Sequence, residues 1–172
     1  ESISMAATPE IPVVIIDVMR AGPSTGMATK VEQSDIRYAI GSGHGDAEKI
    51  VLAAASIEDC YYITQEAFNL AEKFQTPVIV LSDLQFGMCK QSVPAFDLHR
   101  VGIERGKLIR EGLPELDTKK KEYFHRFEDV EDGISPRTIP GVKNGMSLST
   151  GLEHNVFGKP AEGVGDRVME ME

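Results

Sequence analysis

The sequence has no tryptophan and only two cysteines, Cys60 and Cys89, among its 172 residues. Neither cysteine has another cysteine or a histidine at the spacing of a zinc site or an iron–sulfur cluster, which argues against either group being held by this chain. Such sparse cysteine use fits a reducing compartment better than a secreted, disulfide-bonded domain. We therefore expect both cysteines to be buried, reduced thiols in a cytoplasmic protein.

A long hydrophobic run is also missing. The longest apolar stretch, residues 11–18, contains Pro12 and Asp17 and is far shorter than the roughly 20 residues that a membrane-spanning helix needs. The first ten residues lack the basic start and apolar core of a signal peptide, and the chain starts with Glu1 instead of methionine. We expect a chain that does not cross a membrane and that continues a longer protein upstream.

Positive charge is scarce. Eighteen Lys and Arg residues stand against 27 Asp and Glu residues, for a formal net charge of -9. The basic residues are scattered along the chain, so nucleic acid is not an expected partner. A content of 41% hydrophobic and 26% charged residues is typical of a globular protein, and the length favours one domain.

The hydrophobic pattern predicts alternating strands and helices. Short β-branched runs at residues 11–18 and 77–82 are typical of strands buried on both faces, and residues 49–53 form a third such run. Residues 57–74 have the apolar spacing of a helix, and residues 2–8 are expected to end another one. This order predicts an open, parallel α/β sheet whose ligands bind at the carboxyl ends of the strands.

The stretch after the first strand is the main candidate site. It reads RAGPSTGMAT and begins at Arg20. The planar guanidinium matches a carboxylate, the glycines permit close approach of the backbone, and hydroxyls at Ser24, Thr25 and Thr29 add orienting hydrogen bonds. The alternative is a simple strand-to-helix turn with a helix cap at Ser24 or Thr25. The stretch fits neither the dinucleotide-binding fingerprint nor the P-loop pattern.

A histidine between two glycines, His44, is a second candidate. Histidine can carry protons near neutral pH. A tight turn, in which His44 makes only structural hydrogen bonds, explains the same pattern. Both interpretations stay open at this point.

Several motifs together resemble the alpha subunits of 2-oxoacid:ferredoxin oxidoreductases, in particular the 2-oxoglutarate type. In chain order they are IPVVIIDVMRAGPSTGMATKVEQSD, GHG, EAFNLAEKFQTPVIVLSD and DGISPR. The resemblance covers nearly the whole chain. It implies an N-terminally truncated thiamine-diphosphate pyrimidine-binding (Pyr) domain with a parallel α/β sheet and an irregular C-terminal extension. Residues 1–90 would be the back half of that domain, and residues 91–172 an extended arm toward a missing C-terminal domain.

The resemblance also implies an activity. Enzymes of this family oxidatively decarboxylate a 2-oxoacid, here 2-oxoglutarate to succinyl-CoA, and pass the electrons through an iron–sulfur cluster to ferredoxin. Thiamine diphosphate with Mg²⁺ and the cluster would be held largely by the beta subunit or by other parts outside this chain, with CoA as co-substrate. We therefore expect this chain to be inactive by itself.

Site roles follow from the same resemblance. Arg20 is expected to grip the substrate carboxylate, with Ser24 as a further contact. Thr25 and Thr29 would shape the substrate pocket, Thr29 as a selectivity position. Arg137, on an arm that closes over the active-site region, would contact an anion there, or else stabilise the arm as a surface arginine.

Two alternative functions remain at this stage. One is a noncatalytic assembly domain of the same fold, against which the retained Arg20, Thr25 and Thr29 argue. The other is a related thiamine enzyme that uses pyruvate, a branched-chain 2-oxoacid or a different electron acceptor. Two further expectations concern the end of the chain: a solvated helix face at residues 119–122 and the start of a helix at residues 166–172.

Overall fold

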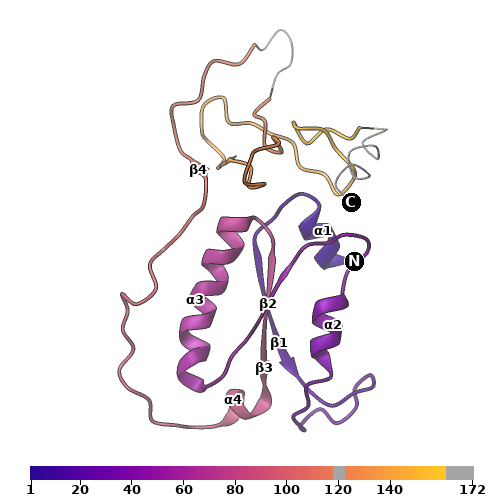
Figure 1. Cartoon of the computed structure of the whole chain (residues 1–172), viewed down its shortest axis with the longest axis vertical. Coiled ribbons are helices and arrows are strands. Elements are labelled where there is room, and N and C mark those ends of the chain that lie inside the picture. The colour runs from indigo at the N-terminus through magenta and orange to yellow at the C-terminus, as the bar shows by residue number, and fades with distance from the viewer. Residues whose placement is uncertain (118–122, 162–172) are drawn as a thin grey trace. The chain divides into compact units, whose positions relative to one another are not determined.

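The computed structural model describes residues 1–117 and 123–161. The chain forms two compact units, Glu1–Glu104 and Arg105–Glu172. In the first unit, strands are flanked by helices on both sides, as Figure 1 shows. These units describe packing within the chain, and the assignment of residues 1–90 and 91–172 to separate domains stays a prediction.

A parallel sheet of three strands, in the order β1-β3-β2, organises the first unit. The strands are β1 (Val13–Met19), β2 (Ile50–Ala53) and β3 (Pro77–Asp83). Each predicted strand is confirmed, although β1 starts two residues later than the apolar run. The register pairs Met19 with Asp83, so β1 and β3 end at the same edge of the sheet.

Four helices surround this sheet among the described residues. The two expected ones are α1 (Ser2–Ala7) and α3 (Ile57–Phe74). Two others, α2 (Asp35–Gly41) and α4 (Leu84–Met88), have no counterpart in the sequence prediction. Helices this short barely repeat the apolar period, and isolated helices of this length are unstable without tertiary packing.

The hydrophobic core consists of two clusters, one on each face of the sheet. Val78 and Val80 of β3 pack with Ala67 and Ala71 of α3, and all four are nearly inaccessible to solvent. The alternate residues of β3 point to the other face. There Ile79 and Leu81 form the second cluster with Met19 of β1 and Ala39 of α2. Because β3 is covered on both faces, its sequence is continuously apolar instead of alternating.

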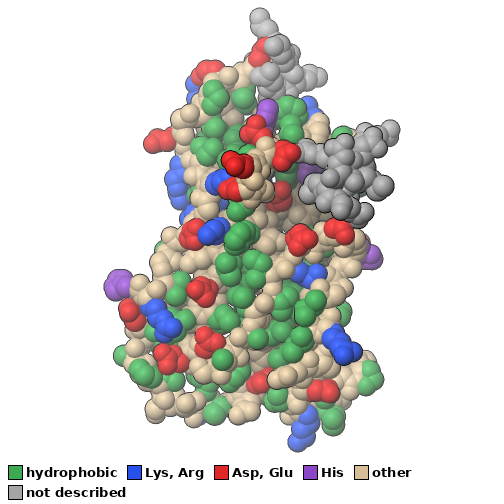
Figure 2. Space-filling model, viewed as in Figure 1, with side chains coloured by type: hydrophobic (Ala, Val, Ile, Leu, Met, Phe, Trp, Pro, Cys, Tyr) green, Lys and Arg blue, Asp and Glu red, His purple; other side chains and the backbone are tan. Residues whose placement is uncertain are grey.

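The strand β1 lies at the edge of the sheet and is less well covered than β3, so the prediction that residues 11–18 are buried on both faces was wrong. Ile16 and Val18 point to the same face as Val14 but remain 58% and 50% exposed. On the face seen in Figure 2, hydrophobic side chains gather over the first unit, and Lys and Arg are scattered among Asp and Glu. The scattered basic side chains agree with the charge pattern of the sequence.

An extended segment, residues 89–104, follows α4 and packs along α3; we call it the strap. Phe96 stacks on Tyr61 with ring centroids 4.1 Å apart, and the Asp97 amide donates to the Tyr62 hydroxyl at 2.9 Å. Near the end of the strap, the Asn69 side chain donates a hydrogen bond to Gly102 O and accepts one from the Glu104 amide. The strap is therefore fastened to α3 at both ends of the helix.

The second unit contains little regular structure in its described part. Two short parallel strands, β4 (Leu108–Ile109) and β5 (Arg137–Thr138), pair with each other. This agrees with the expected irregular extension. The helix face predicted at residues 119–122 and the helix start at residues 166–172 lie outside the described residues.

The prediction of two buried thiols was wrong. Cys60 is half-buried in the first turn of α3, and Cys89 is exposed at the end of α4; neither forms a disulfide. Burial, followed by the charge of Asp59, raises the pKa of the Cys60 thiol. Cys89 is exposed because α4 is short and the chain leaves the sheet there. In the described part of the chain, no helix is long and apolar enough to cross a membrane.

Candidate functional site

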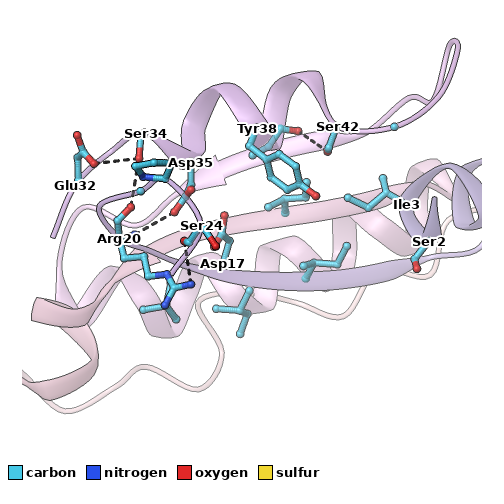
Figure 3. A pocket seen from close by; sticks show the side chains of 18 of the residues that line it. Ser2, Ile3, Asp17, Arg20, Ser24, Glu32, Ser34, Asp35, Tyr38 and Ser42 are labelled. Atoms are coloured by element: carbon cyan, nitrogen blue, oxygen red, sulfur yellow. Dashed lines mark hydrogen bonds between the residues drawn. The ribbon is translucent and has the colours of Figure 1, made fainter. Parts of the chain in front are cut away.

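A hollow of about 960 Å³ lies along β1 and α2 in the first unit. Its lining comes from α1, β1, the loop after β1, α2 and the turn after α2. Figure 3 shows Asp17, Arg20, Ser24 and Asp35 gathered at one end of it. The hollow therefore begins at the carboxyl end of β1, where ligands of parallel α/β sheets bind.

The loop after β1 closes on itself. The Ala21 amide donates to Lys30 O at 3.1 Å, and the Met27 amide donates to Ala21 O at 3.0 Å. Gly26 makes this turn possible, with a φ of +49°. No helix begins at Ser24 or Thr25, so the alternative of a helix cap there was wrong: the next helix, α2, starts only at Asp35.

Arg20 is held at its backbone and leaves most of its guanidinium donors available. Its amide donates to Asp35 Oδ2 at 3.0 Å, and its carbonyl accepts from Ser34 Oγ at 3.3 Å. The guanidinium Nη2 donates to Ser24 O at 3.4 Å. Among the described residues the guanidinium makes this one hydrogen bond. Its remaining N–H groups can therefore bind a carboxylate.

The hydroxyl residues of the loop divide into two groups. Ser24 lines the hollow together with Arg20. Thr25 and Thr29 are exposed on the same loop and do not line this hollow. The structure therefore brings Ser24 to Arg20, and the roles of the two threonines in shaping a substrate pocket stay predictions.

Sequence reasoning missed most polar residues of the hollow. They are Glu1, Ser2, Asp17, Glu32, Ser34, Asp35, Tyr38 and Ser42. Burial, and then the negative charge of Asp35, raise the pKa of the Asp17 carboxyl. A carboxyl with a raised pKa keeps its proton, and hence a hydrogen-bond donor, to a higher pH than an ordinary aspartate. The one available signal was Asp17 itself, a charge inside an otherwise apolar strand.

His44 lies in a tight turn beside the hollow. Its amide donates to Ser4 Oγ at 2.6 Å, and the glycines on either side have φ angles of +121° and +58°. The side chain is exposed and does not line the hollow, although Gly43 does. The turn itself is thus confirmed, and proton transfer by His44 stays a prediction.

Arg137 belongs to the second unit. Its amide donates to Lys107 O at 3.1 Å, and its guanidinium donates to Arg105 O at 3.1 Å. Burial lowers the pKa of Arg137. These contacts help to join β5 to the segment before β4, and an anion contact by Arg137 stays a prediction.

Within residues 1–117 and 123–161, no group of three or more His, Cys, Asp or Glu side chains is placed to hold a metal ion.

A family model described as "Pyruvate flavodoxin/ferredoxin oxidoreductase, thiamine diP-bdg" matches residues 1–172. The chain belongs to this family. A solved structure of a 2-oxoglutarate:ferredoxin oxidoreductase from Magnetococcus marinus, with 2-oxoglutarate, coenzyme A and succinyl-CoA bound, superposes with a TM-score of 0.86 at 38% identity. That match covers 99% of this chain and 28% of the other. The predicted family and the parallel α/β fold class are confirmed.

Two curated relatives point the same way within this oxidoreductase family. The chain is 46% identical to the 2-oxoacid:ferredoxin oxidoreductase 2 alpha subunit of Aeropyrum pernix, over 94% of this chain and 24% of that protein. It is 53% identical to the 2-oxoglutarate synthase subunit KorA of Archaeoglobus fulgidus, over 83% of this chain and 47% of that protein. The chain thus spans between a quarter and half of the length of these relatives.

Proposed function

We propose that this chain is part of the alpha subunit of a 2-oxoacid:ferredoxin oxidoreductase whose substrate is 2-oxoglutarate. In the assembled enzyme the substrate loses its 1-carboxylate as carbon dioxide. The remaining acyl group forms a thioester with CoA, giving succinyl-CoA, and the electron pair passes to ferredoxin. The names of the Archaeoglobus relative and of the Magnetococcus enzyme support 2-oxoglutarate over pyruvate or a branched-chain 2-oxoacid.

The placement of Arg20 carries this proposal. Arg20 stands one residue past β1, its backbone is held by α2, and its guanidinium faces a hollow with donors to spare. A guanidinium binds a carboxylate through two parallel hydrogen bonds, which fixes both the position and the orientation of the substrate. Ser24, on the same hollow, is in place for a further hydrogen bond.

The cofactors fit this chain less well than the substrate does. Thiamine diphosphate, when bound, supplies the carbanion stabilisation that decarboxylation needs. Within the described residues, no three His, Cys, Asp or Glu side chains are grouped to hold a metal ion. We therefore assign the diphosphate with its Mg²⁺, and the iron–sulfur cluster, to the beta subunit or to parts of the protein outside this chain.

The partners follow from the same proposal. The alpha subunit works with a beta subunit, ferredoxin accepts the electrons, and CoA is the co-substrate. A reducing cytoplasm suits this chemistry and the two free cysteines. This chain alone is expected to be inactive.

The test uses full-length alpha subunit assembled with its beta subunit, thiamine diphosphate and CoA. The measurement is 2-oxoglutarate-dependent reduction of ferredoxin or a viologen dye. Losing a charge-assisted bidentate contact costs about 1.5–3 kcal/mol, so Arg20→Ala should raise the KM for 2-oxoglutarate by about 10- to 100-fold. Arg20→Lys keeps the charge but not the planar guanidinium. Its KM for 2-oxoglutarate should lie between the values of Arg20→Ala and of the wild type.

Arg37→Ala is the matched control. Arg37 is exposed on α2 and does not line the hollow, so its removal should change the KM by less than about twofold. Equal effects of the two arginine variants would contradict the assignment of Arg20. A wild-type assembly that oxidises no 2-oxoacid would favour the noncatalytic alternative.

A further inference from the structure

The start of α2 holds both peptide groups that flank the Cα of Arg20. The Arg20 amide donates to Asp35 Oδ2 at 3.0 Å, and Ser34 Oγ donates to the Arg20 carbonyl at 3.3 Å (Figure 3). These partners lie 15 and 14 residues further along the chain. One side chain thus holds the peptide plane before the Arg20 Cα and another holds the plane after it, and the Arg20 side chain leaves the backbone between the two.

The sheet and the loop do not supply this restraint. The pairing of β1 with β3 ends at Met19 and Asp83, one residue before Arg20. The loop after Arg20 is closed by hydrogen bonds among Ala21, Met27 and Lys30, and all three lie within the loop. Ser34 and Asp35 therefore make the described contacts that join the Arg20 backbone to α2.

The start of α2 differs from the other capped helices. In α3 and α4, the side chains of Ser56 and Asp83 accept hydrogen bonds from amides of their own first turn. Ser34 occupies the corresponding position of α2 and makes no such bond. Its hydroxyl lies 3.3 Å from Arg20 O and 3.2 Å from Glu32 Oε2 instead. A residue type that normally caps its helix is used here to hold the loop.

We infer that Asp35, assisted by Ser34, is a positioning residue that aims the Arg20 guanidinium into the hollow. The direction in which a side chain leaves the backbone follows from the dihedral angles at its Cα. Flanking peptide groups that are free to rotate would therefore spread the guanidinium over several directions. The inference rests on the proposed function of Arg20 as the carboxylate-binding group. Asp35 acts on Arg20 through the Arg20 backbone amide.

The kinetic test uses the same assembled enzyme. Asp35→Ala should raise the KM for 2-oxoglutarate by about tenfold, the size expected for one hydrogen bond to a charged group, and leave the KM for CoA unchanged. Asp35→Asn keeps an oxygen acceptor and should recover most of this loss. Glu66→Ala removes an exposed acid from α3, and should leave both constants at their wild-type values.

A double-mutant cycle separates positioning from a general structural role. If Asp35 acts through Arg20, Asp35→Ala should add no further rise in KM once Arg20 is alanine. An equal rise in both backgrounds would overturn the inference. If Asp35→Ala does not assemble with the beta subunit, Ser34→Ala takes its place in the cycle. Ser34→Ala should raise the KM for 2-oxoglutarate by a smaller factor when Arg20 is present, and should not raise it when Arg20 is alanine.

Hydrogen exchange gives a readout besides activity. Loss of the Asp35 acceptor should speed exchange of the Arg20 amide by about tenfold, and Asp35→Asn should restore its protection. A KM that rises in Arg20→Ala but not in Asp35→Ala would overturn this inference and leave the proposed function standing. A KM that is unchanged in Arg20→Ala would overturn both.

Discussion

At the scale of single residues, Gly26 decides whether the Arg20 loop can close. Its φ of +49° is rare for residues with a side chain, and a Cβ added there would lie 2.0 Å from Ala21 O. The same carbonyl accepts the Met27 amide that closes the loop. Any larger residue at position 26 must therefore break the closure.

We expect Gly26→Ala to lower the free energy of unfolding by about 2 kcal/mol, because the left-handed backbone and the clash both add to its cost. Urea unfolding followed by tyrosine fluorescence measures this. Gly41→Ala is the control: Gly41 is the last residue of α2, and a Cβ there meets no atom within 4 Å. The control should leave stability unchanged or raise it by about 0.4–1 kcal/mol. Similar losses in both variants would show that the turn is not the cause.

At the scale of secondary structure elements, the strap and α3 form one assembly through a few contacts. Exposed ion pairs join Glu58 to Arg100 at 3.8 Å and Lys73 to Glu104 at 3.6 Å. Such pairs contribute little in water. The two hydrogen bonds of the Asn69 side chain to Gly102 and Glu104 are therefore the main polar fastening near the end of the strap.

Asn69→Ala should release this end of the strap. We expect the Glu104 amide, which donates to Asn69 Oδ1 at 2.9 Å, to exchange about tenfold faster, since a net hydrogen bond contributes about 1 kcal/mol. Asn69→Asp keeps the acceptor and should protect this amide. Exchange measured by mass spectrometry or NMR decides between the outcomes. Unchanged protection in Asn69→Ala would mean that the other contacts of the strap with α3 are enough to hold this end.

At the scale of the whole chain, both hydrophobic clusters belong to the first unit. Every residue of the two clusters lies before Glu104. In the described part of the second unit, the one buried apolar side chain is Phe124. Both clusters that pack against the sheet therefore lie within residues 1–104.

A chain that ends at Glu104 should unfold cooperatively. Its free energy of unfolding should lie within about 1 kcal/mol of the value for the same residues in the full chain. Chemical denaturation followed by circular dichroism measures this. A chain that ends at Phe74 is the control; it lacks β3, the central strand, and should not unfold cooperatively. Loss of cooperativity in the longer chain would mean that residues 105–172 stabilise the sheet.

The strands, the long helix and the family were determined by the sequence itself. β3 is apolar without interruption because both of its faces are buried, and α3 has a helical period over five turns, beginning at a Ser56 cap. The apolar run of β3 and the helical period of α3 are local signals, because each one is visible in consecutive residues of the sequence. The loop after β1 was likewise recognised from its own composition, with Arg20 as its charged group.

Only the tertiary structure decided which side chains meet at the hollow. Asp35 belongs to a polar segment with no visible period, and its contact with Arg20 spans 15 residues. Thr25 and Thr29 share the closed loop with Arg20 and yet are exposed and do not line the hollow. Sequence patterns report burial and periodicity, whereas the meeting of distant polar groups depends on how the loop and α2 pack against the sheet.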